Sequence, residues 1–247
     1  MVKLKTVAAA AVLLATSGIH ADARPAHGIS TKIDTLFRVD MLNSNREYVE
    51  HLIGPAKYTD ATSGDHSKER RYYIVDSCNV EIGYKDGAVT YLGLKGVSLH
   101  CRFPLQRFIP HLPPTHVDAL SELTFDTFEN EVGSGIDQNF YDVECLGSCG
   151  NSADPSVSLF HNGPHVDEFI NIMIEQDYPY SDGASDKAFA ALEDVLIKRE
   201  DSDYVAYGRV KCDVKYQPLD RELFKKSHVK NVYVGFDLGD HTPSCRN

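Results

Sequence analysis

Residues 71–94 read RYYIVDSCNVEIGYKDGAVTYLGL, and this stretch decides the fold class. It is rich in tyrosine, isoleucine and valine, and apolar and polar residues alternate along Val80–Tyr84. Asp86-Gly87 tolerates the positive φ angles of a tight hairpin turn. The pattern predicts a three-stranded antiparallel meander, with strands at Arg71–Asp76, Cys78–Tyr84 and Ala88–Leu94.

The residues before this meander have a pattern typical of helices. Apolar residues recur at helical intervals from Ile33 to Ile53. Asn43-Ser44-Asn45 interrupts them and is suited to cap a second helix that begins near Arg46. Gly54-Pro55 ends that helix. The polar residues Thr59–Arg70 predict an exposed loop before the first strand.

The middle of the chain shows a similar order of elements. Residues 102–116 contain four prolines and predict a crossing segment. A helical pattern follows over Val117–Val132 and ends at the glycines Gly133 and Gly135. Strand-like segments come next, at Phe140–Cys145, Ser156–Phe160 and Glu168–Glu175.

Helix, glycine stop and three strands therefore occur at residues 33–101 and again at 117–176. We expect a divergent internal duplication. The alternative is that an α+β protein yields this order of elements by chance.

The last third of the chain contains both helical and strand-like spacings of apolar residues. Ser185 is expected to cap a helix over Asp186–Lys198. Tyr204–Tyr216 alternates and predicts a strand through Cys212. A short helix at Leu219–Lys226 and a final strand at Val232–Leu238 complete the prediction.

The N-terminus has the three parts of a secretory signal. Lys3 and Lys5 are followed by a short apolar run and by Ala21-Asp22-Ala23, so we expect a signal peptide over residues 1–23. The alternative is an uncleaved anchor helix, although a span needs about 20 apolar residues. No cysteine lies directly after the cleavage point, so no lipid anchor is expected, and the sequence predicts a periplasmic or secreted protein without membrane insertion.

These patterns predict an α+β fold in which helices pack on antiparallel β meanders. The expected order is a first helix/three-strand module at 24–101, a second module at 102–183 and a C-terminal αβ extension at 184–247. Alternatively, the extension forms one globular unit with the second module.

Six cysteines in an exported chain favour three disulfides. Six cysteines allow fifteen pairings, and proximity in the chain favours Cys78–Cys101, Cys145–Cys149 and Cys212–Cys245.

The formal net charge is −11, and removal of Lys3, Lys5 and Asp22 with the signal peptide makes it −12. Such a surface repels phosphate backbones, so nucleic acid is not an expected partner. The overall charge favours a basic protein partner.

Catalytic signatures are incomplete. Ser227-x-x-Lys230 matches a short pattern of penicillin-interacting enzymes, but the accompanying motifs are missing. Cys145 and Cys149 have three residues between them, whereas a thioredoxin-type redox motif has two. The sequence marks no pair of Asp or Glu residues as an acid and base. We expect no catalytic residues.

Metal-site patterns are also incomplete. His161 and His165 are separated by a turn sequence, and prolines lie between His111 and His116. The acidic segment Asp177–Asp186 lacks the register of a calcium loop. We expect no metal and no cofactor.

Tyrosine is abundant, at 13 residues, and tryptophan is absent. Tyr72, Tyr84 and Tyr91 are distributed over the first meander and are candidate partner-binding residues, because tyrosine suits interfaces. The alternative is that these rings pack in the core.

The order from Arg46–Val49 through Gly54-Pro55, Tyr72–Cys78 and Asp86-Gly87 resembles the helix–helix–three-strand module of small envelope proteins. That module occurs singly in outer-membrane assembly lipoproteins of the BamE/SmpA type and in tandem in secreted β-lactamase inhibitor proteins. The resemblance implies a protein-binding sheet. This chain departs from the pattern in its cysteine count, its missing lipidation cysteine and its additional C-terminal residues.

Together these observations favour an exported, non-catalytic protein-binding protein of the inhibitor, immunity or envelope-assembly type. Residues 59–70 and 145–151 are the expected contact loops. The alternative is an exported hydrolase whose Asp, Glu or His residues carry no sequence signature.

Overall fold

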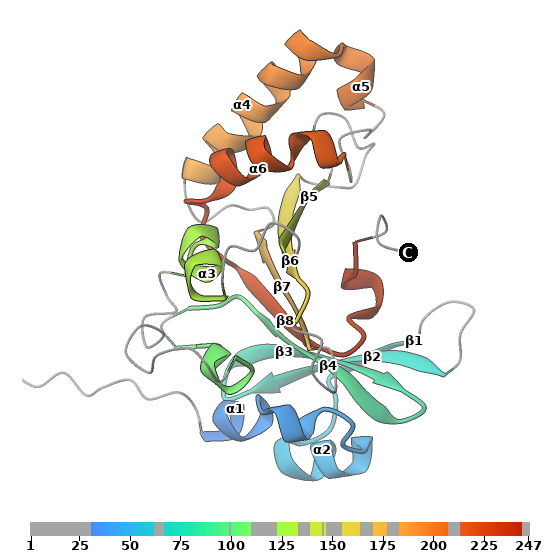
Figure 1. Ribbon diagram of the computed structural model, residues 1–247. Helices are drawn as coiled ribbons and strands as arrows, with labels where there is room; N and C mark the ends of the chain where they lie inside the picture. The colour runs from blue at the N-terminus through green and yellow to red at the C-terminus, as the bar shows by residue number, and fades with distance from the viewer. Residues whose placement is uncertain are drawn as a thin grey trace, which may run out of the picture.

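An eight-stranded antiparallel sheet, in the order β1-β2-β3-β4-β8-β7-β6-β5, forms the centre of the protein (Figure 1). The computed structural model describes residues 31–61, 67–98, 100–109, 123–132, 139–144, 146, 155–163, 170–176, 183–206 and 213–243. The strands are β1 (Tyr58–Ala61), β2 (Lys68–Val75), β3 (Cys78–Lys85), β4 (Ala88–Lys95), β5 (Asn139–Glu144), β6 (Ser156–His161), β7 (Asn171–Gln176) and β8 (Asn231–Gly235).

The predicted meander is confirmed as β2, β3 and β4. Its two turns have positive φ at both central residues: 48° and 71° at Asp76 and Ser77, and 51° and 79° at Asp86 and Gly87. This backbone matches the twist of a two-residue hairpin. Successive side chains point to opposite faces of these strands. One face enters the core, and the other, which we call the open face, is buried over most of β3 and β4 and reaches solvent towards β1.

The predicted loop over Thr59–Arg70 is wrong at both ends. Tyr58–Ala61 forms β1, and β2 begins at Lys68. Charged residues hid the strand pattern, because Glu69 and Arg71 lie on the face that packs near α2 and neutralise each other there. Arg71 binds the carboxylates of Glu50 and Glu69 at 2.7 and 3.1 Å.

The second set of strands is confirmed as β5, β6 and β7. The predicted last strand is also present, but β8 ends at Gly235, and the chain then leaves the sheet. β8 lies between β4 and β7 and joins the two sets of strands into a continuous sheet. The sheet therefore crosses both predicted module boundaries, while the duplication itself stays a prediction.

Helices line the inward face of the sheet. Their apolar side chains form one core with inward residues of the strands, whereas the C-terminal segment lies on the other side of β2–β4 (Figure 1). Asn45 caps α2 as expected, its Oδ1 accepting from the Tyr48 amide at 2.8 Å. The helices are α1 (Thr31–Leu36), α2 (Arg46–Ile53), α3 (Phe125–Val132), α4 (Gly183–Arg199), α5 (Ser202–Ala206) and α6 (Gln217–Phe224), with 3-10 turns η1 (Val39–Met41), η2 (Leu105–Arg107), η4 (Val214–Tyr216) and η5 (Gly239–His241).

Two predictions in the C-terminal third are wrong. Ser185 does not cap α4 but lies inside it and is buried. The predicted strand Tyr204–Tyr216 is replaced by α5 and η4 where the structure describes it. Local caps explain this choice: Asp201 accepts from the Tyr204 amide and Asp213 from the Lys215 amide, and each satisfies a helix-start donor. The remaining predicted elements agree, with α3 at the end of its predicted range and α6 close to its own.

The far edge of the sheet is closed by α6. The side-chain amide of Gln217 accepts from the Tyr141 backbone N–H at 2.7 Å and donates to the Tyr141 carbonyl at 2.6 Å. One side chain thus occupies a position that a ninth strand would take, which protects the edge of β5 from pairing with another chain. β1 forms the opposite edge.

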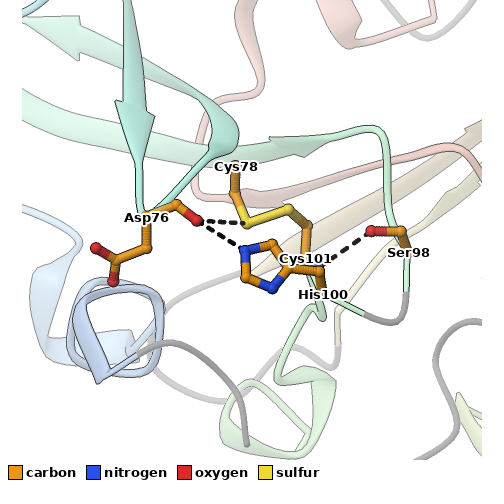
Figure 2. The surroundings of a disulfide bond; sticks show 5 residues. All are labelled: Asp76, Cys78, Ser98, His100 and Cys101. Atoms are coloured by element: carbon orange, nitrogen blue, oxygen red, sulfur yellow. Dashed lines mark hydrogen bonds between the residues drawn. A yellow bond between two sulfur atoms is a disulfide. The ribbon is translucent and has the colours of Figure 1, made fainter. Parts of the chain in front are cut away.

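The predicted disulfide Cys78–Cys101 is confirmed. It connects the start of β3 to the segment after β4, and Figure 2 shows His100 and Ser98 beside it. His100 Nε2 lies 2.9 Å from the Asp76 carbonyl. The other four cysteines, and with them the two other predicted pairings, lie outside the described residues, as does the predicted signal peptide.

Replacement of Cys78 and Cys101 by serine is expected to lower the free energy of unfolding by about 3 kcal/mol, because the bond closes a loop with a sequence separation of 23. Urea denaturation of the wild type and the double variant measures this difference. A loss below about 1 kcal/mol would show that the crosslink adds little beyond the hydrogen bonds of the meander.

Asp220 of α6 generates a second prediction. Burial, with the nearby charge of Asp142, raises the pKa of Asp220 to about 7, and its Oδ1 has no hydrogen-bond partner among the described residues. An acid whose pKa is raised by folding costs stability as pH rises from its unfolded to its folded value, here from about 4 to about 7. Asp220→Asn should be more stable than the wild type at pH 8 by about 1–3 kcal/mol and should flatten the pH profile.

Urea denaturation between about pH 5 and pH 8 tests this effect of Asp220. Asp194→Asn, at an exposed position of α4, is the matched control. Parallel pH profiles for the wild type and Asp220→Asn would contradict the prediction.

Candidate binding site

The open face of the sheet carries a row of side chains that crosses all eight strands. In strand order, the register aligns Tyr58, Tyr72, Glu81, Gly93, Tyr233, Met173, Phe160 and Phe140. The centre of this row is buried, whereas Tyr58 at the β1 end is 60% exposed. The open face is therefore covered in the middle and accessible at one edge.

Two tyrosine rings lie flat on the centre of this face because glycine stands opposite each of them. A Cβ at Gly83 would come within 1.9 Å of the Tyr91 ring, and one at Gly93 within 2.7 Å of the Tyr233 ring. Each glycine is the cross-strand partner of the tyrosine that covers it. The two rings are 6.4 Å apart and meet edge to face, so they make an aromatic floor across β3, β4 and β8.

Residues 236–243, which we call the C-terminal strap, cover this floor. The His241 ring stacks on Tyr233 with centroids 3.8 Å apart, and it meets Tyr91 edge-on at 5.5 Å. Leu238 is fully buried in a small cluster with both tyrosines. The strap is thus packed on the sheet by aromatic and aliphatic contacts.

Glu81 fixes the strap at its centre. This carboxylate is 1% exposed, and its Oε1 lies 2.6 Å from His241 Nε2 and 2.7 Å from the donating Tyr91 hydroxyl. Lys95 Nζ is 3.7 Å from Oε2. Burial alone would raise the pKa of Glu81, but the His241 bond, supported by Tyr91 and Lys95, outweighs burial and holds that pKa below its ordinary value.

A cavity of about 500 Å³ lies between the strap and one end of β2–β4. Tyr91 and Thr90 line it from the sheet, and Asp237 and Asp240 line it from the strap. Further lining residues are Lys68, Arg70 and Lys85. The cavity therefore has both acidic and basic side chains at its edge and an aromatic ring in its wall.

The accessible edge of the open face holds an apolar patch, which we call the edge patch: Tyr58, Tyr72 and Ile74. The rings of Tyr58 and Tyr72 are 5.6 Å apart on neighbouring strands. Ile74 lies on the same face of β2 and is 52% exposed. An ion pair between Arg70 and Asp60, at 2.8 Å, borders the patch. Adjacent exposed apolar groups of this kind are typical of contact surfaces.

The three tyrosines predicted from the sequence occupy different places. Tyr72 belongs to the edge patch and is partly exposed. Tyr84 is buried in the core, where its hydroxyl lies 3.0 Å from that of Tyr73. Tyr91 is buried under the strap. Tyr72 is therefore the member of this set with ring surface open to solvent.

Other candidates from the sequence do not gather into a site. Ser227 is buried, as is His161, whose Nδ1 lies 2.6 Å from Asn139 Oδ1. Burial lowers the pKa of His161 to about 4. His111, His116 and His165 lie outside the described residues, as do residues 62–66 and most of 145–151 in the predicted contact loops.

One group of three potential metal ligands occurs among the described residues: Cys78, His100 and Cys101, with ligand atoms within 4.8 Å of one another. Both sulfurs are joined in the disulfide of Figure 2. This group is therefore a crosslink with a neighbouring histidine rather than an open set of ligands.

Sequence reasoning missed Glu81 and His241, which are separated by 160 residues in the chain. A signal was present, because Gly83 and Gly93 lie inside the predicted strands, and glycine in a strand often marks a close approach by another group. The two glycines do not, however, indicate which side chain approaches the strand.

Comparison with family models, curated proteins and solved structures finds no match to this chain. Among the described helices, none has the length and apolar character needed to cross a membrane.

His241→Phe tests how the strap is held. Phenylalanine keeps a ring against Tyr233 but leaves Glu81 without its histidine partner, so the free energy of unfolding should fall by about 1–3 kcal/mol at pH 7. A depressed carboxyl pKa stabilises the fold above the unfolded pKa, and this contribution is lost as pH falls through the folded value. The effect of the variant should therefore shrink as the pH falls from about 4 to about 3, below the ordinary pKa of a glutamate.

Urea denaturation at about pH 7 and about pH 3 measures the effect of His241→Phe, with the exposed His100→Phe as control. Equal destabilisation at the two pH values would contradict an ionic role for the Glu81–His241 contact.

Proposed function

We propose that this chain is an exported, non-catalytic protein-binding protein, and that its edge patch is the contact surface. The signal pattern of residues 1–23 and the disulfide support export. Inhibitor, immunity and envelope-assembly roles are the concrete forms of this proposal, in keeping with the resemblance of the first meander to envelope modules.

The observation that carries the proposal is the exposure of Tyr58 and Ile74 side by side with Tyr72 on a strand edge. Tyrosine provides a large contact area for a small loss of side-chain freedom, and aromatic residues are enriched in the centres of interfaces. The surrounding Arg70–Asp60 pair supplies the polar rim that such interfaces have.

The scaffold suits this role because it is held rigidly. β2 is paired along its whole length with β3, and Arg71 and Arg46 connect the inner face of β2 to α2 through Glu50 and Glu69. A rigid surface loses little conformational entropy when a partner binds.

The Glu81–His241 contact favours a second candidate, an exported hydrolase, because a carboxylate–histidine pair beside a cavity is an arrangement that acid–base catalysis uses. Against it, the imidazole is stacked on Tyr233 and Nε2 faces Glu81.

Gentle crosslinking of the mature protein in the cells that produce it, followed by mass spectrometry, is expected to yield one stoichiometric protein partner. Tyr58→Ser combined with Ile74→Ser should reduce the crosslinked fraction at least about tenfold, because apolar anchors at an interface centre dominate affinity. Tyr48→Ser combined with Ile197→Ser removes apolar side chains that are 52% and 43% exposed on α2 and α4, and is the matched control.

A partner retained equally by both double variants would place the contact elsewhere on the protein. No partner for the folded wild type would reject the binding proposal. A hydrolase screen with wild type and Glu81→Gln would then test the second candidate.

A further inference from the structure

A cluster of cations lies at one end of the open face, in a chain whose overall charge is −11. Lys68 of β2 and Lys85 of β3 are direct cross-strand partners, and Arg70 is two residues along β2 from Lys68. Like charges placed directly opposite each other destabilise a strand pair. All three residues line the cavity beside the strap, so we call them the basic rim.

The strap supplies carboxylates to this rim. Asp237 Oδ2 lies 3.3 Å from Lys68 Nζ, and Asp240 Oδ2 lies 3.4 Å from Arg70 Nη1. Both distances are long for charge-assisted hydrogen bonds, and both aspartates are well exposed to solvent. Exposed ion pairs of this kind contribute little net stability, so another anion can replace them at low cost.

The strap can release these carboxylates without leaving the sheet. Its attachment depends on the buried Leu238 and on His241, which contacts Glu81 and Tyr233. Lys85 forms no ion pair with any residue that the structure describes. Lys68 pairs with Asp237, and Arg70 pairs with Asp240 and, at 2.8 Å, with Asp60 of β1, so Lys85 is the cation of the basic rim that the described residues leave without an ionic partner.

We propose that the basic rim and its cavity bind an acidic segment of the protein partner, in competition with Asp237 and Asp240 of the strap. This inference rests on the proposed binding function and specifies the chemistry of the partner: an exposed segment with at least two carboxylates a few residues apart. The overall charge of the chain favours a basic partner, but charges within a Debye length of the contact, about 8 Å at physiological salt, decide local recognition.

The spacing of the strap supports this partner chemistry. Asp237 and Asp240 are three residues apart and reach Lys68 and Arg70 respectively. The strap therefore shows that two carboxylates three residues apart, on a segment that turns at Gly239, reach the basic rim. The edge patch begins on the same face of β2, two residues beyond Arg70, so one partner can reach both surfaces.

The test uses a capped fluorescent peptide with the sequence FDLGD and a twin in which both aspartates are asparagine. Fluorescence anisotropy is measured with the full mature chain and its variants. Asp237→Asn combined with Asp240→Asn frees the rim, and should bind FDLGD at least about tenfold more tightly than the wild type does. Lys68→Ala combined with Lys85→Ala should bind it more weakly than the wild type.

Asp194→Asn combined with Glu222→Gln neutralises two exposed acids on α4 and α6, and is the control for net charge. It should bind FDLGD as the wild type does. The asparagine twin should bind the wild type and the strap variant Asp237→Asn/Asp240→Asn at least about tenfold more weakly than FDLGD does, and binding of FDLGD to both should weaken as salt rises from about 50 to about 500 mM.

Equal binding of the two peptides, or no gain for the strap variant over the control variant, would overturn the inference. Circular dichroism establishes that each variant is folded. If the peptide result is negative while the edge-patch variant still loses the crosslinked partner, the partner chemistry is wrong and the binding function stands. If the folded wild type also yields no crosslinked partner, the binding function itself is wrong.

Discussion

The burial of one carboxylate, that of Glu81, constrains the whole open face of the sheet. A charged group with 1% exposure is stable only when partners replace the water that it has lost. Tyr91 provides one hydrogen bond from the neighbouring strand, and His241 provides the other from the end of the chain. The strap must therefore return across β8 and β4 to reach β3, and its path determines which parts of the open face are covered.

The glycines of β3 and β4 are a consequence of the same constraint. Tyr91 can donate to Glu81 only if its ring lies down across Gly83, and Tyr233 can support the imidazole only if its ring lies across Gly93. Alanine at Gly83 would place a methyl carbon inside the Tyr91 ring, so the ring would have to leave the floor. Small residues, flat rings and a buried acid–histidine contact therefore depend on one another.

Local patterns of the sequence predicted the first meander and the strands of the second set well, because hairpins are determined by nearby residues such as Asp86-Gly87. The position of β8 between β4 and β7 could not be predicted in this way, since Tyr91 and Gly235 pair across most of the chain. Errors arose where capping or charge overrode alternation, as in the 204–216 segment and at Lys68. Of the candidate site, the sequence indicated Tyr72 on the open face but not Glu81 or His241, whose contact requires the complete sheet.

The position of β8 also explains why a local surface can differ in charge from the whole chain. β8 carries the strap to the middle of the sheet, so Asp237 and Asp240 arrive beside the basic rim on β2, from the far end of the sequence. Without them, Lys68 and Lys85 would lie opposite each other with no ionic partner among the described residues, and Arg70 would keep only Asp60. The anchoring contacts of the strap are buried, whereas its ionic contacts are exposed. The ionic contacts can therefore break while the anchoring contacts remain. A partner that binds these cations has to replace only the exposed ion pairs of the strap. The aromatic floor and the Glu81–His241 contact continue to hold the strap on the sheet.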